Sequence, residues 1–226
     1  MTAFTGFPPE TFAFLADLRQ NNKRSWFEAN RERYEMYWKA PALAFIETIA
    51  SSMRTLDPPL KAEAAVNGSL RRINRDVRFS GDKAPYDPHV HMIFWAGAHP
   101  NRSAGFHLVL NPDGIGYGVG NWSLDAAALQ RYRDKVCDPV FRAPLINALK
   151  EAESIGSFMD EPHLKRLPKG YEGDPEWDYL LRYKGLISRT MEGQLMPDWI
   201  KTPKAVDEVL ARARHLSPLI GWINDI

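Results

Sequence analysis

Apolar side chains in the first part of the chain recur every three or four residues, the spacing of a helix that buries one face. A first helix is predicted over residues 10–20. A second is predicted over 26–39, because Ser25 and Glu28 form a capping box in front of it. The apolar stripe continues after Pro41, which either kinks this helix or begins a third.

The middle of the chain changes to the two-residue period of a half-buried strand. Residues 90–96 are rich in aromatic and β-branched side chains and predict one strand. Apolar residues then alternate on both sides of the turn sequence 111–114, which predicts a β-hairpin. A ligand or another backbone can closely approach one face of the second hairpin strand. That face carries Gly114, Gly116, Gly118 and Gly120.

Helical spacing returns after Ser123 and again after Asp138, and both residues are suitable N-caps. A short helix over 174–184, a strand over 186–191 and a last helix from Pro203 follow. Helices, then strands, then helices again favour an α+β fold over a doubly wound parallel sheet. We therefore expect a small antiparallel sheet that is covered on one face and flanked by N-terminal and C-terminal helices.

The chain has 226 residues, of which 44% are hydrophobic and 25% charged, as in ordinary globular proteins. This length predicts a single globular domain over residues 1–226. Lys and Arg total 29 against 28 Asp and Glu, a net charge of +1, so no global field attracts nucleic acid or anionic lipid. We expect no strong nucleic-acid binding.

Cys137 is the single cysteine, so the chain forms no intramolecular disulfide. The first residues lack the basic and apolar regions of a secretory signal, and no window approaches the roughly 18 apolar residues of a membrane span. These features predict a soluble, cytoplasmic protein without membrane attachment. No recognised spacing of ligands predicts a cofactor or a metal.

The segment 70–91 follows neither period and reads LRRINRDVRFSGDKAPYDPHVH. It mixes five cations and three aspartates with aromatic residues and histidines, a composition that a buried helix or strand does not need. The segment therefore marks the candidate site. Walker A and G-x-G-x-x-G loops are absent from the sequence, as is G-x-S-x-G, so no nucleotide-binding or nucleophile motif assigns a reaction.

Several patterns occur together: Trp26-Phe27, Pro168-Lys169-Gly170-Tyr171 and the string R-x-x-R-D-x-R-F-S-x-D-K-x-P-Y, which begins at Arg72. In these patterns the chain resembles the conserved hypothetical proteins called domain of unknown function 2461. The resemblance covers nearly the whole chain and implies a single domain with the central segment as its signature, but no activity. Asp87 stands where the family usually has lysine, and Gly173-Asp174-Pro175 replaces an Asp-His-Pro triplet.

The arginines of the segment have two interpretations. Their forked guanidinium groups match phosphate or carboxylate oxygens, and they also match the neighbouring aspartates in a structural network. Asp76 and Asp82 are candidate Mg²⁺ ligands, although Asp82 beside Gly81 also suits a turn. His89, His91 and His107 share a strand face, which suits zinc or copper, or simply the polar face of a half-covered sheet.

We hypothesise a basic cleft that binds a small anionic ligand bearing phosphate or carboxylate. Arg72, Arg75 and Arg78 bind the anion, and Lys83 adds a charge. Asp76 orients an arginine, and Tyr86 packs against the ligand. The complete set of candidate ligand-binding residues is Arg72, Arg75, Asp76, Arg78, Phe79, Ser80, Asp82, Lys83, Tyr86, His89, Arg133 and Lys169. The alternatives are a non-catalytic interaction module that docks on nucleic acid or a protein partner, and a purely structural network.

Overall fold

The computed structural model describes residues 3–100, 102–191 and 196–226. The α-helices are α1 (Pro9–Gln20), α2 (Arg24–Ala29), α3 (Arg31–Arg33), α4 (Ala40–Met53), α5 (Ala126–Cys137), α6 (Pro139–Ser154) and α7 (Ala205–Asn224). A π-helix (Tyr34–Lys39) joins α3 to α4, and short 3-10 helices span Asp178–Arg182 and Asp198–Lys201. The strands are β1 (Val90–Trp95), β2 (Gly105–Asn111), β3 (Gly114–Asn121), β4 (Phe158–Met159) and β5 (Leu186–Arg189).

The strands of the described residues form one antiparallel sheet in the order β1-β2-β3-β5-β4. The predicted hairpin is confirmed, because β2 and β3 pair with Asn111 opposite Gly114. The predicted strand at residues 90–96 is β1, which pairs with β2 through Val90 opposite Leu110. The fold is therefore α+β, as predicted from the sequence, in which apolar residues change from helical to strand spacing and back to helical spacing.

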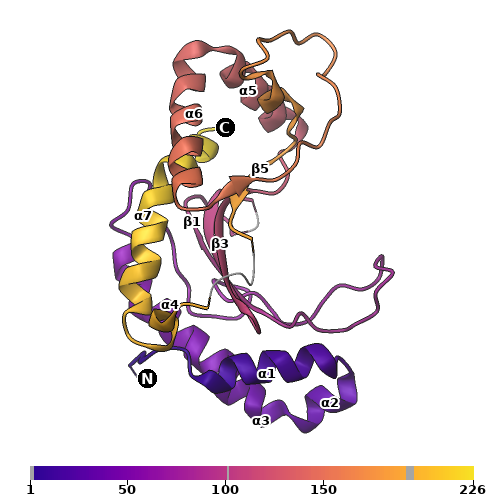
Figure 1. The fold of residues 1–226 in the computed structure, drawn as a ribbon, viewed down its shortest axis with the longest axis vertical. Coiled ribbons are helices and arrows are strands. Elements are labelled where there is room, and N and C mark those ends of the chain that lie inside the picture. The colour runs from indigo at the N-terminus through magenta and orange to yellow at the C-terminus, as the bar shows by residue number, and fades with distance from the viewer. Residues whose placement is uncertain (1–2, 101, 192–195) are drawn as a thin grey trace.

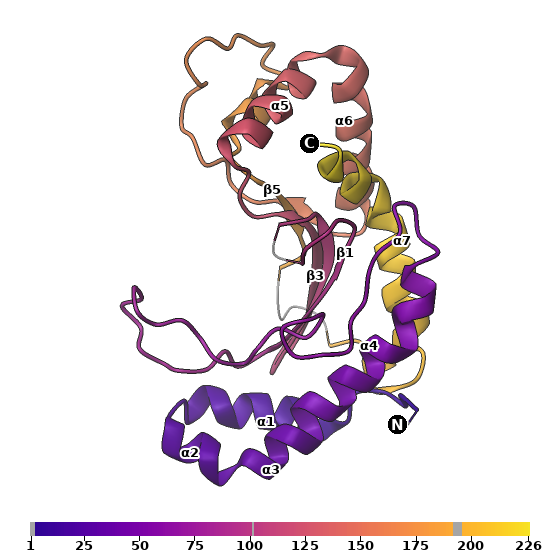
Figure 2. The same ribbon diagram turned by 180° about the vertical axis from the view of Figure 1, so that it is seen from behind.

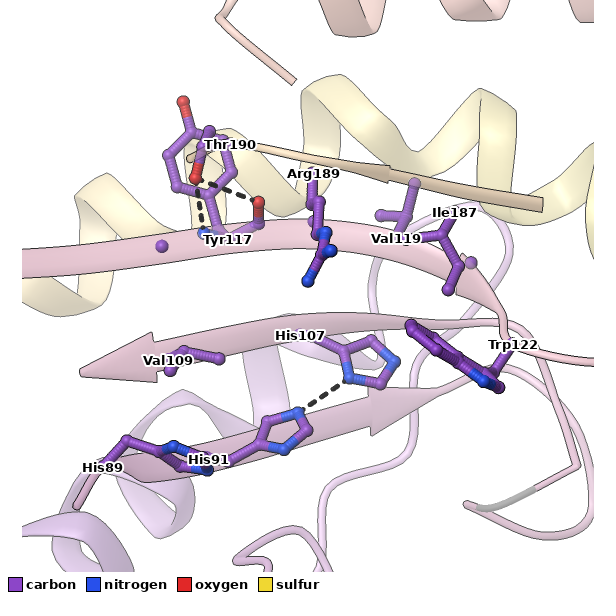
Figure 3. A pocket seen from close by; sticks show the side chains of 13 residues that line it. His89, His91, His107, Val109, Tyr117, Val119, Trp122, Ile187, Arg189 and Thr190 are labelled. Carbon is purple, nitrogen blue, oxygen red and sulfur yellow. Dashed lines mark hydrogen bonds between the residues drawn. The ribbon is translucent and has the colours of Figure 1, made fainter. Parts of the chain in front are cut away.

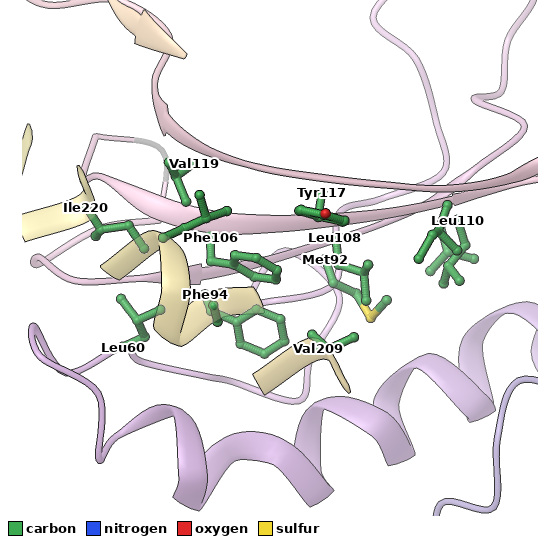
Figure 4. Close-up of a cluster of buried hydrophobic side chains, with 14 of the residues drawn as sticks. Leu60, Met92, Phe94, Phe106, Leu108, Leu110, Tyr117, Val119, Val209 and Ile220 are labelled. Atoms are coloured by element: carbon green, nitrogen blue, oxygen red, sulfur yellow. The ribbon is translucent and has the colours of Figure 1, made fainter. Parts of the chain in front are cut away.

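Helices α4 and α7 cover one face of this sheet (Figures 1 and 2). Successive strand residues point to opposite faces, so Phe94, Phe106 and Val119, which lie opposite one another on β1, β2 and β3, share that face. All three are buried, and they pack in one cluster with residues of α7 such as Ile220 (Figure 4). The part of the core that supports the sheet therefore lies between it and these two helices, and the same cluster continues into α1, α5 and α6.

The other face of the sheet carries His91, His107 and Gly118, and we call it the open face. Helices α1 and α2 lie beyond one end of the sheet, and α5 lies beyond the opposite end (Figures 1 and 2). A long arm, residues 74–86, projects on the side away from α7 (Figures 1 and 2). These placements leave the open face clear of the described helices.

The capping box predicted at Ser25 is wrong. Helix α2 begins two residues before the predicted start, at Arg24, and the Glu28 carboxylate accepts a 2.8 Å hydrogen bond from the Arg24 side chain instead of capping the backbone. The expected continuous helix is interrupted at Asn30, whose backbone N–H donates to carbonyls of the preceding turn. Pro41 is the second residue of α4, which follows the π-helix without a break, and the Tyr37 carbonyl four residues earlier accepts a hydrogen bond from the Thr11 hydroxyl instead.

The N-cap predicted at Ser123 is also displaced. Helix α5 is capped by Asp125, whose side chain accepts a 2.8 Å hydrogen bond from the Ala128 N–H. The Asp138 cap of α6 is confirmed by a 2.8 Å bond from the Val140 N–H. None of the helices within the described ranges is long and apolar enough to cross a membrane.

Candidate ligand pocket on the open face of the sheet

The open face carries a pocket of about 310 Å³ over strands β2, β3 and β5 (Figure 3). Its floor is the glycine-bearing face of β3, with Gly116, Gly118 and Gly120, where no side chain rises from the strand. The alternating glycines predict that a ligand or another backbone can closely approach this face. A Cβ at Gly118 would lie 2.5 Å from the Ser188 carbonyl oxygen, so the tight pairing with β5 also requires glycine there.

The neighbouring strands form the walls of the pocket. Val109 and His107 rise from β2, opposite Gly116 and Gly118, and Ile187 and Arg189 rise from β5, opposite Gly120 and Gly118. The indole of Trp122 follows β3 and stands at the edge of the pocket with 69% of its surface exposed. The lining therefore combines apolar walls with a few polar groups, as is usual in small-molecule sites.

Two histidines of the pocket are hydrogen-bonded to each other. The His91 Nε2 and His107 Nδ1 atoms lie 2.9 Å apart. Burial and then the nearby Arg71 charge lower the pKa of His107 to about 4. Burial, followed by His107, His89 and Arg71, lowers the pKa of His91 to about 2. Both rings are therefore neutral at pH 7, and whichever ring donates, the pair retains one further N–H donor and one further acceptor nitrogen.

Arg71 lies beside the pocket histidines, along the outer edge of β1, which does not pair with β2. Its backbone N–H donates to the His91 carbonyl over 2.9 Å, and the preceding Leu70 bridges to Met92, which faces the core. Leu70 is buried and faces the core with Met92. Because successive residues of an extended segment point to opposite faces of the sheet, Arg71 points to the open face. Burial and then the charge of Arg72 lower the pKa of its half-buried guanidinium. Among the described residues no carboxylate forms an ion pair with Arg71.

The histidines do not assemble a metal site. The described part of the chain contains no group of three or more His, Cys, Asp or Glu side chains that could hold a metal ion. His89 lines the pocket, but its ring centroid lies 6.1 Å from that of His91.

The cations of the arm are engaged with acceptors of the arm itself. The Arg75 guanidinium donates to the Asp82 carboxylate at 2.6 Å and to the Ala84 carbonyl at 3.1 Å, and its Nε lies 3.5 Å from Asp87. Its Nη2 also reaches the Ser80 hydroxyl at 3.5 Å. Asp87, where the family usually has lysine, thus contributes to this network.

The tip of the arm shows the same pairing. Arg78 forms a two-pronged interaction with Asp76 through contacts of 2.7 and 2.9 Å, and the Lys83 ammonium donates to the Val77 carbonyl at 3.0 Å. The Phe79 ring, with Arg78 5.8 Å from its centroid, is 95% exposed. Asp76, which was expected to orient an arginine, thus binds the Arg78 guanidinium. Arg75 pairs with Asp82 and Asp87 instead.

The base of the arm is anchored to the N-terminal helices. Tyr86 is buried and stacks on Phe27 with the ring centroids 4.2 Å apart. The Asn22 side-chain amide donates to the Tyr86 carbonyl at 2.8 Å, and its oxygen accepts from the Tyr86 N–H at 3.1 Å. Tyr86, a candidate for ligand packing, thus packs against the protein.

Arg133 and Lys169 lie away from the arm. Arg133 belongs to α5, which both views place at the opposite end of the sheet from the arm (Figures 1 and 2). Its guanidinium lies 5.5 Å from the Tyr171 ring centroid, and its buried Nε has no hydrogen-bond partner. The exposed Lys169 lies two residues before Tyr171. The structure thus does not bring these two cations into one cluster with Arg72, Arg75 and Arg78.

Sequence reasoning found part of the pocket and missed the rest. The alternating glycines and the histidine periodicity both pointed to this face, and His89 belongs to the candidate set. Ile187 and Arg189 carried no signal, because their proximity to β2 depends on the long-range pairing of β5 with β3. Arg71 stood among other arginines, and only its position beside β1 distinguishes it.

The fold and the pocket together define an α+β protein with a ligand-sized cavity on the uncovered face of an antiparallel sheet. The chain belongs to the family of conserved hypothetical proteins (DUF2461), whose match covers residues 10–222. No curated protein and no solved structure matches the chain.

Proposed function

We propose that this protein binds a small organic anion, bearing a carboxylate or phosphate, in the pocket on the open face. The observation that carries the proposal is the half-buried Arg71, which has no acidic partner among the described residues and lies close enough to His91 and His107 to lower the pKa of both. An anion placed there would gain a charge-assisted hydrogen bond without breaking an existing ion pair.

The neutral histidine pair supports the same ligand. It supplies a hydrogen-bond donor and an acceptor beside the apolar walls, which suits a molecule with both an anionic group and an uncharged body. The hypothesis drawn from the sequence places the anion at Arg72, Arg75 and Arg78, with Lys83 adding a charge. Arg75, Arg78 and Lys83 already have acceptors, and this favours Arg71 as the anchoring residue.

The test is a thermal-shift screen of small carboxylates and phosphates with wild type and Arg71→Gln. We expect a subset of anions to raise the melting temperature of wild type, because a ligand that binds only the native state stabilises it. This shift should be lost in Arg71→Gln. Arg72→Gln is the matched control, since it removes the same charge from the next, exposed position. Equal shifts in wild type and Arg71→Gln would contradict the proposal.

A second candidate is a non-catalytic module that docks on nucleic acid or protein through the arm. It is favoured by the exposed Phe79, held at the end of a segment that its own hydrogen bonds order. Exposed aromatic rings near cations are typical of stacking on single-stranded nucleic acid. Oligonucleotide binding that Phe79→Ala abolishes and Arg71→Gln preserves would support this candidate.

A further inference from the structure

The pocket has the form of a narrow trough. Strands β2 and β5 both pair with β3, so their backbones lie roughly 9–10 Å apart, twice the usual strand spacing. Side chains rise from β2 and β5, while the glycines of β3 leave the strip between them bare. The space above β3 is therefore restricted across the strands.

Several groups that border the trough are flat. The His107 imidazole stands on one wall, the Arg189 guanidinium rises from the other, and the Trp122 indole stands at one edge (Figure 3). The Arg189 guanidinium is held by a 2.8 Å bond from its Nε to the Asp160 carboxylate, which fixes its orientation. Planar groups of this kind stack on aromatic rings, through π-stacking or cation–π contact.

The remaining lining is apolar, and the cavity of about 310 Å³ is at the lower end of the range for small-molecule sites. Val109 and Ile187 provide apolar contact on the two walls, and the glycine floor lets a flat molecule approach the backbone. A ligand of one or two rings fits these dimensions.

We infer that the pocket selects flat aromatic or heteroaromatic acids over aliphatic acids of the same size and charge. The inference rests on the proposed function, because Arg71 holds the acid group. The trough over the β3 glycines, with Trp122 at its edge, recognises the shape of the ring.

Benzoate and cyclohexanecarboxylate form a matched pair for the test. They have the same charge and ring size, but only benzoate is flat and aromatic, and the saturated ring buries at least as much apolar surface. A preference for benzoate therefore reports ring shape and stacking instead of hydrophobicity. Saturation-transfer NMR titration of wild type should give an affinity for benzoate roughly three- to tenfold higher, the range that one aromatic contact supplies.

The variant is Trp122→Ala, which removes an exposed side chain and should leave the fold intact. It should reduce the preference for benzoate while cyclohexanecarboxylate binding stays nearly unchanged. Phe79→Ala, which removes another exposed aromatic ring far along the arm, is the control and should retain the preference.

The outcomes separate the two proposals. Equal affinities for both acids in wild type, or a preference that survives Trp122→Ala, overturn the selection of flat ligands and leave anion binding standing. Absence of binding by either acid, together with no Arg71-dependent shift from any anion in the thermal screen, overturns both.

Discussion

At the scale of single residues, burial decides which charged groups are available for chemistry. Arg71 and the pair His91–His107 lie on the open face, where burial lowers all three pKa values and keeps the two imidazoles neutral. The arginines of the arm are more numerous, but their carboxylate partners neutralise them. A single cation without an acidic partner is thus a better indication of ligand binding than a segment with many paired cations.

The histidine pair makes a prediction for the pH dependence of stability. The folded-state pKa of His107, about 4, lies below the ordinary value of 6.5, so protonation favours the unfolded state. The free energy of unfolding should therefore decrease as the pH falls from about 6.5 towards 4, with His91 acting in the same direction. Urea unfolding at several pH values should show a shallower decrease for His107→Gln than for wild type.

The matched control for this measurement is His163→Gln, which removes an exposed histidine outside the pocket. It should keep the wild-type pH dependence. Identical slopes for wild type and His107→Gln between pH 4 and 6.5 would show that the pair does not carry this effect. The carboxylates of Asp76, Asp82 and Asp113 have lowered pKa values, so they act mainly below this window.

At the scale of elements, the arm is an ordered projection and the sheet is a scaffold. A bridge between Asn74 and Tyr86 closes the base of the arm, and a 2.9 Å bond from the Arg75 N–H to the Pro85 carbonyl continues it. The Arg75 side chain then joins both sides of the loop. Sequence reasoning left two interpretations of this segment open, an anion site and a structural network, and the contacts of Arg75 support the second for this residue.

Arg75→Ala should consequently destabilise the protein by about 1–2 kcal/mol, because several hydrogen bonds to one half-buried guanidinium are lost. The cost is smaller than for a fully buried pair, since the Asp82 side chain is 67% exposed and remains hydrated. Hydrogen exchange should also show lower protection of backbone N–H groups in the arm.

Arg78→Ala is the control for this prediction. The Arg78 and Asp76 side chains are both exposed, so their separation should cost less than about 1 kcal/mol. A stability of Arg75→Ala equal to or above that of wild type would indicate that Arg75 is held in place against repulsion from other cations, as an anion-binding residue would be.

At the scale of the whole molecule, the balanced charge of +1 predicts weak nucleic-acid binding. Duplex affinity requires several phosphate contacts, and at least three cations of the arm already have internal acceptors. Fluorescence anisotropy with labelled duplex and single-stranded oligonucleotides at physiological salt should give dissociation constants in the non-specific range, about 10⁻⁴ to 10⁻⁶ M. Sub-micromolar duplex binding with a steep salt dependence would contradict this expectation.

The sequence by itself determined the α+β class, strand β1, the hairpin β2–β3 and the cap at Asp138, because each depends on local periodicity or on a local hydrogen bond. It also indicated that one face of β3 is bare. A local signal was wrong where a residue has two possible partners nearby. Glu28 was expected to cap the backbone at Ser25, but it pairs with the Arg24 side chain instead.

Only the tertiary structure decided which chemistry-bearing residues meet. The pairing of β5 with β3 brings Ile187 and Arg189 to the glycine floor, and the edge position of residue 71 turns one arginine of the segment towards the histidines. The same packing places α5, with Arg133, at the far end of the sheet. Contacts between residues distant in sequence depend on strand order and on burial, and neither is encoded in the spacing of neighbouring side chains.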